Sequence, residues 1–346
     1  MRLFGSENTP ADAAKVIADF WTWWAKARPE IDAQVEAGNA EAIAEALESA
    51  VNAMHPSLVW EIAPGGTARY ALVVSACNDP ELRSFTHRWA LAAPPDGELW
   101  EFHPSRQAKP QAAELSVEVE GREFDLNRLV VAVQAPPNAP RAEISVFHPI
   151  FPDLEDEARM DASLMALDWL LGEDEVARWV GEIVPAEFEP IDAFPAIHLP
   201  GVIADLAKGF VEEQWMLMEG TTPTGSRVTA LARYPLRPVD HPLNDQHIAI
   251  GLPYRNSDSD GQPSGGSLDA LRDFEERLTG LLGTLGTAVL AAHMSADGRR
   301  TLHVYADPEG EAASAINELA ATWKEGEAEV EVADDPSWSE VAHFLT

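Results

Sequence analysis

The pattern that most constrains this chain runs from residue 247 to 332, where short apolar runs alternate with longer segments of helical periodicity. Four of the runs are typical of strands, and two segments repeat apolar residues at three- and four-residue spacing, as one face of a helix does. One segment cannot satisfy both periods, so the order of the elements is β-α-β-β-α-β. The predicted strands lie at 247–254, 287–294, 301–306 and 328–332, and the predicted helices at 268–282 and 309–323.

This order predicts a ferredoxin-like α+β module at the C-terminal end. Ser267 is suited to cap the first helix, because its hydroxyl can accept a hydrogen bond from a free backbone amide. Pro336 favours the start of a short tail helix, which we expect to dock on the module. The side chains expected to dock are Val341, Phe344 and Leu345.

Two histidines lie on the arms of the hairpin predicted around Asp297-Gly298. If the turn has three residues, His293 and His303 share one face of the sheet as diagonal neighbours. If the turn has two residues, they lie on opposite faces. Even the first arrangement supplies only two ligands, so we predict no metal site.

The first part of the chain predicts helices flanking a mainly antiparallel sheet. A helix is expected from Thr9 to Pro29, where the proline should end it, and a second from Ala40 to Met54. Prolines then punctuate residues 185–200, which favours domains at 1–200 and 201–346. The cluster of Trp21, Trp23 and Trp24 is typical of a core, and a ligand platform is the alternative.

Charge and cysteine content narrow the class of protein. The formal net charge is −34 in 346 residues, which disfavours nucleic-acid binding and favours either solubility or a basic partner. Cys77 is the single cysteine and follows an apolar run, so we expect a small buried residue rather than a nucleophile. No apolar stretch suits a signal peptide or a membrane helix, which predicts a cytoplasmic protein without a membrane partner.

Residues 271–278, 302–306 and 335–338 carry one resemblance to known proteins. On these residues, the segment from Glu213 onward resembles the uncharacterised bacterial family called domain of unknown function 695. A second resemblance is carried by residues 60–62, 75–76, 93–94, 100–102 with Arg106, 167–168 and 171–173. On these, the first part is similar to the N-terminal region of longer uncharacterised bacterial proteins. The topology of the C-terminal module is also loosely similar to regulator of ribonuclease E activity B, which binds a protein. The resemblances imply no activity, cofactor or catalytic residues.

No motif for metal binding, phosphate binding or nucleophilic catalysis has the spacing and structural context that it requires. The acidic loop at 256–261 has Ser267 where a calcium loop needs a bidentate carboxylate. Gly280, Gly283 and Gly286 close a predicted helix instead of opening one, as a phosphate loop would. No serine stands in a nucleophile elbow. We therefore predict no cofactor.

The least ordinary cluster is 100–106, where aromatic side chains, an imidazole and a guanidinium gather at a strand end. Trp100, His103 and Arg106 are our candidate binding residues, and a structural salt bridge or an edge strand is the alternative. The functional hypothesis is a non-enzymatic binding or regulatory protein with an unknown protein or small-molecule partner. The competing hypothesis is an enzyme, possibly a hydrolase, with a polar site in an inter-domain cleft.

Overall fold

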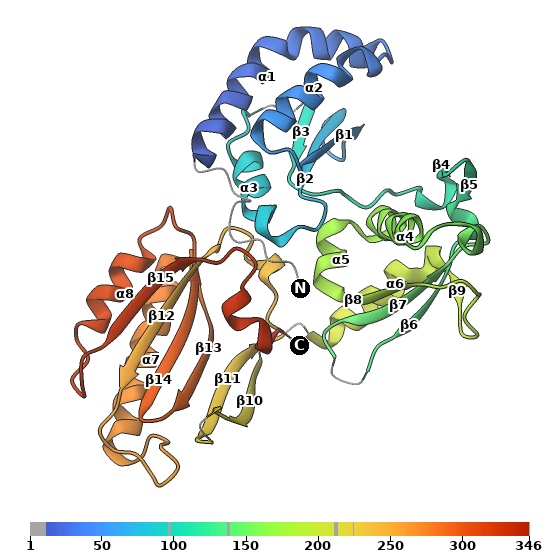
Figure 1. The fold of residues 1–346 in the computed structure, drawn as a ribbon. Helices are drawn as coiled ribbons and strands as arrows, with labels where there is room; N and C mark the ends of the chain where they lie inside the picture. Colours follow the sequence, from blue (N-terminus) through green and yellow to red (C-terminus); the bar gives the residue numbers. More distant parts are fainter. Residues whose placement is uncertain (1–11, 96–97, 137–138, 211–213, 224, 346) are drawn as a thin grey trace. The chain divides into compact units, whose positions relative to one another are not determined.

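The computed structural model of this chain describes residues 12–95, 98–136, 139–210, 214–223 and 225–345. Two compact units divide it, Met1–Val211 and Glu212–Thr346, and Figure 1 shows the elements of each. Both units combine helices with sheets, which confirms the predicted α+β class.

The first helix, α1 (Ala13–Glu36), begins after Asp12, whose carboxylate accepts a hydrogen bond from the Lys15 backbone amide at 3.1 Å. The start predicted at Thr9 lies outside the described residues. The predicted end at Pro29 is wrong, because the helix continues through the proline. Pro29 removes one backbone hydrogen bond, but Ile31 and Val35 beyond it are buried, and their burial offsets that loss.

The predicted single sheet of the first unit is in fact three small sheets, with strand orders β1-β2-β3, β4-β5 and β8-β7-β6-β9. Two strand pairs, β2–β3 and β7–β8, are parallel, because a helical crossover joins the strands of each pair. The strands are β1 (Val59–Pro64), β2 (Tyr70–Ser75), β3 (Trp100–His103), β4 (Ser116–Val119), β5 (Arg122–Asp125), β6 (Val130–Gln134), β7 (Ala142–Phe147), β8 (Val180–Pro185) and β9 (Phe194–Pro195). The helices after α1 are α2 (Glu41–Met54), α3 (Pro80–Leu91), α4 (Asp156–Leu171), α5 (Glu173–Trp179) and α6 (Leu199–Ala207).

Two apolar cores hold the first unit together. One core joins α1, α2 and α3 to the sheet β1-β2-β3. The other joins the sheet β8-β7-β6-β9 to α4, α5 and α6. Trp21 and Trp24 are buried in the first core, as predicted, whereas Trp23 is only half-buried. Large aromatic side chains supply much of the apolar area that this core removes from water.

The second unit contains one six-stranded sheet in the order β10-β11-β13-β14-β12-β15, with all neighbouring strands antiparallel. Two helices cover one face, and the tail segment η7 packs on the other face through Val341 and Phe344, as predicted. The strands are β10 (Gln214–Thr221), β11 (Arg227–Tyr234), β12 (Gln246–Pro253), β13 (Ala288–Ala296), β14 (Arg299–Ala306) and β15 (Glu329–Asp334). The helical elements are α7 (Gly265–Leu285), α8 (Ala312–Ala320) and η7 (Ser339–Phe344).

The hairpin between β13 and β14 has a two-residue turn. Asp297 and Gly298 both have positive φ, at 50° and 78°, and Ala296 pairs with Arg299. Such a turn matches the twist of the flanking strands. His293 therefore lies on the side of α7, with its ring 3.7 Å from the Glu275 carboxylate, and His303 lies on the opposite face. The two-residue alternative is the one that the structure adopts.

Candidate functional site

Trp100, the first predicted binding residue, lies inside the aromatic core. Only 1% of it is exposed, and its indole nitrogen donates a hydrogen bond to the Asp32 carboxylate at 2.7 Å. The ring packs edge-on against Trp24, with centroids 5.2 Å apart. The partner carboxylate satisfies the one polar group that this buried side chain carries.

His103 lies on the other side of β3 and belongs to a group that fixes a turn. Its Nε2 lies 3.0 Å from Glu101, whose carboxylate also accepts hydrogen bonds from the Gly66, Thr67 and Ala68 amides. Burial acts against the charge of Glu101, but these hydrogen bonds outweigh it and hold the pKa well below its usual range. The group ties β3 to the hairpin turn between β1 and β2.

Arg106 is the predicted residue that belongs to a larger polar arrangement, which we call the Glu173 cluster. Its guanidinium contacts Asp168 at 3.2 Å and the Cys77 sulfur at 3.7 Å. Glu173 is 2% exposed and accepts hydrogen bonds from the Ser75 hydroxyl at 2.5 Å and from the Asn78 and Arg106 amides at 2.8 and 3.1 Å. The cluster comprises Ser75, Cys77, Asn78, Arg106, Asp168 and Glu173.

Cys77 is exposed, so the expectation that it is buried is wrong. It follows the central strand β2, where Cys77 and Asn78 have φ of 52° and 62° and lead into α3. This left-handed conformation turns the side chain out of the apolar run. Partial burial nevertheless raises the pKa of the thiol, against the opposing effect of Arg106, and a protonated thiol is a poor nucleophile.

Asp168 should make the stability of the first unit pH-dependent. Burial and the neighbouring Glu173 carboxylate outweigh Arg106 and raise the pKa of Asp168 to about 6. The folded protein therefore holds this proton after the unfolded chain has released it. We expect stability to fall by up to about 3 kcal/mol between about pH 4 and pH 6.5. Urea unfolding across this range should show a shallower fall for Asp168→Asn. The exposed Asp161→Asn in the same helix should keep the parental profile, and equal profiles for all three proteins would contradict the assignment.

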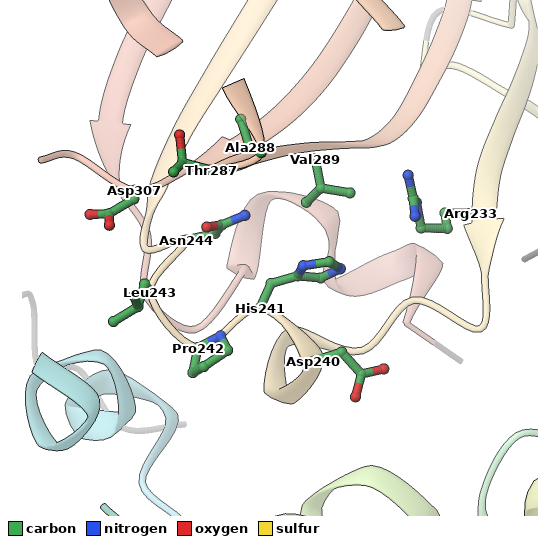
Figure 2. A pocket seen from close by; sticks show the side chains of 11 residues that line it. Arg233, Asp240, His241, Pro242, Leu243, Asn244, Thr287, Ala288, Val289 and Asp307 are labelled. Atoms are coloured by element: carbon green, nitrogen blue, oxygen red, sulfur yellow. The ribbon is translucent and has the colours of Figure 1, made fainter. Parts of the chain in front are cut away.

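A pocket of about 380 Å³ lies at one end of the sheet in the second unit, where β11 ends and β13 begins. The loop 240–244 forms one side and the first residues of β13 form the other. Figure 2 shows Asp307 and Arg233 at opposite ends of the pocket, with Asn244 and His241 between them. The two ends therefore carry charges of opposite sign, and the carboxylate of Asp240 also lines the pocket.

His241 is held in a neutral form inside this pocket. Its ring stacks on Trp338, with centroids 6.0 Å apart and planes 11° apart. Burial lowers the pKa of His241, nearby Arg233 lowers it further, and Asp240 opposes them. A neutral imidazole has one nitrogen that donates a hydrogen bond and one that accepts, so it suits a polar ligand.

The loop that carries His241 is anchored before any ligand arrives. The Asn244 side-chain amide donates to the Tyr305 backbone carbonyl at 3.3 Å, and the backbone carbonyl of Asn244 accepts from the Trp338 indole at 2.8 Å. Trp338 stacks on Tyr305 with centroids 3.9 Å apart, and the Tyr305 hydroxyl donates to Asp335 at 2.5 Å. The pocket wall is therefore preorganised, which reduces the entropy lost on binding.

A buried histidine pair lies on the same face of the sheet as Tyr305. His247 Nε2 lies 3.0 Å from His303 Nδ1. Burial, together with His247 and His343, lowers the pKa of His303 to about 4, so the pair is uncharged at neutral pH. Within the described residues, no three His, Cys, Asp or Glu side chains are grouped to hold a metal ion.

Sequence reasoning missed the pocket, although His241-Pro242 stands out as one of four histidines that precede a proline. That dipeptide predicts an extended or turn segment, which the loop provides. The convergence of 233, 241–244, 287–289 and 307 depends on strand order, which no local pattern gives.

Over the described part of the chain, no helix is long and apolar enough to cross a membrane.

Part of the chain matches the profile of a known protein family. Residues 237–346 match the profile of a family of unknown function (DUF695). The match contains the tail and most of the pocket, and it confirms the resemblance of the C-terminal part. No curated protein and no solved structure matches the chain.

Proposed function

We propose that this chain is a non-enzymatic binding protein whose pocket in the second unit holds a small zwitterion, such as a free amino acid. The observation that carries the proposal is the placement of Arg233 and Asp307 at opposite ends of one preformed pocket. A guanidinium recognises a carboxylate and a carboxylate recognises an ammonium group, so a zwitterion complements both ends. The chain has a single cysteine, Cys77, so it forms no internal disulfide, and we propose that the protein is cytoplasmic.

The size and contacts of the pocket support a small ligand. A volume of about 380 Å³ lies at the low end of the range for small-molecule sites, roughly 300–1,000 Å³. Arg233 Nε donates to the Leu290 carbonyl at 3.3 Å, and Asp307 accepts from the Glu309 amide at 3.1 Å. These contacts fix the directions of both side chains. His241 and Asn244 supply hydrogen bonds between the charged ends.

The test is calorimetric titration of the full chain with three sets of small molecules: amino acids, simple carboxylates and simple amines. We expect measurable binding only for molecules that carry both charges. His241→Phe keeps the ring on Trp338 but removes both nitrogens, and should weaken binding at least about tenfold. His198→Phe, at an exposed position in the first unit, is the matched control.

Three results would contradict the proposal. The first is no binding from any of the three sets, and the second is equal binding of amino acids and of molecules with one charge. The third is conversion of the bound molecule into a product during the titration, which would favour the enzyme alternative.

A further inference from the structure

A second hollow, independent of the pocket described above, lies between α1 and α2 in the first unit. Its volume is about 410 Å³. From α1, Phe20 and Trp23 supply large aromatic side chains, whereas α2 contributes Met54 and otherwise small side chains, including Ala46 and Ala50. The small side chains on one helix leave room between two helices that otherwise pack closely.

Trp23 differs from its neighbours in the tryptophan cluster. Trp21 and Trp24 are buried in the core, whereas Trp23 is half-buried and lines the hollow. Its ring lies against Phe20, with centroids 5.5 Å apart and planes tilted by 50°. Two rings of the cluster therefore lie in the core, whereas the third packs against the core and leaves part of its surface facing the hollow.

Asp19 lies four residues before Trp23, on the same side of α1, and also lines the hollow. Its side chain is 65% exposed and pairs with Lys15 at 2.5 Å. An exposed pair of this kind is weak, so another cation can replace the lysine ammonium. The described part of these two helices, from Asp12 to Met54, carries eight carboxylates and three cationic side chains, which favours a cationic ligand.

We propose that this hollow binds a small hydrophobic cation, such as a quaternary or aromatic amine. The apolar body lies on Phe20 and Met54, and the charged nitrogen lies between the indole of Trp23 and the carboxylate of Asp19. An aromatic face attracts a cation through its quadrupole, and the carboxylate adds a direct charge interaction.

Calorimetric titration of the full chain with benzyltrimethylammonium tests the proposal, with benzyl alcohol and benzoate as uncharged and anionic comparisons. The cation should bind at least about fivefold more tightly than either comparison. Asp19→Asn should weaken the cation about fivefold and leave benzyl alcohol unchanged. Asp205→Asn removes a carboxylate from the similarly exposed Lys208–Asp205 pair and should change nothing.

Ala46→Leu is a second test of the hollow, and it alters no buried core side chain. Ala46 is exposed on α2, and leucine is also a good helix former, so the variant should fold normally while filling the hollow. We expect at least a tenfold loss of cation affinity, or about 1.4 kcal/mol. Three results would overturn the proposal: no binding of the cation, equal binding of benzyl alcohol, or binding unaffected by Ala46→Leu. None of them bears on the zwitterion pocket, whose variants lie in the other unit.

Discussion

Glu173→Ala should lower the free energy of unfolding of the first unit by about 4 kcal/mol. The carboxylate is buried and accepts three hydrogen bonds, two of them from the backbone amides of Asn78 and Arg106. Alanine leaves those donors without their acceptor, and each unsatisfied buried donor costs about 1–3 kcal/mol.

Chemical denaturation of the full chain and hydrogen exchange of the segments after β2 and β3 measure this effect. The amides of 76–79 and 105–107 should lose protection first, because the carboxylate anchors both segments. Glu157→Ala is the matched control, since Glu157 is exposed in the first turn of α4 and should cost less than about 0.5 kcal/mol. A loss below about 1 kcal/mol for Glu173→Ala would show that the cluster contributes little to stability.

Asp335→Ala should have a comparable effect in the second unit, about 4 kcal/mol. The carboxylate accepts hydrogen bonds from the Tyr305 hydroxyl, from the Ser339 amide and hydroxyl, and from the Glu340 amide. Burial acts against its charge, but these hydrogen bonds prevail and lower the pKa of Asp335. Because the folded pKa is below the ordinary value, this stabilisation is present above about pH 4 and disappears as the pH falls further.

The expected consequence is release of the tail from the sheet. Trp338, Val341 and Phe344 should become exposed, with loss of the apolar contacts that they make to the face around Tyr305. Limited proteolysis of the tail detects this change, and so does the near-ultraviolet circular dichroism signal to which Trp338 contributes. Asp334→Ala alters the exposed neighbour and should leave both signals unchanged. An Asp335→Ala protein that keeps its tail protected would contradict the anchoring role.

Local patterns were sufficient to predict most elements of the second unit. The helix face Leu271, Phe274, Leu278 and Leu282 is buried as its spacing indicates, and Asp297-Gly298 forms the turn. The sequence did not show that β11 pairs with β13 and extends the sheet to six strands. Such pairing joins segments distant in the chain, and it depends on which face each strand buries.

In the first unit, local rules failed where tertiary burial outweighed them. Pro29 has a strong tendency to end a helix, yet Ile31 and Val35 gain enough from the core to continue α1. The parallel pair β2–β3 could have been predicted, because helix α3 lies between those strands. Of the three predicted binding residues, Trp100 lies in the core, His103 supports a turn, and Arg106 belongs to the Glu173 cluster. Trp100 and His103 point to opposite sides of β3, and Arg106 lies beyond the end of that strand.

The strand order of the second unit has a consequence for how it folds. β12 lies between β14 and β15, so both partners of this strand follow it in the chain. The hairpin β13–β14 closes through a two-residue turn, whereas pairing of β12 must close a much longer loop at a higher entropic cost. The hairpin is therefore expected to form first and to provide the edge on which β12 assembles, followed by β15. Changes at Asp297-Gly298 should slow folding, whereas changes in β15 should mainly speed unfolding.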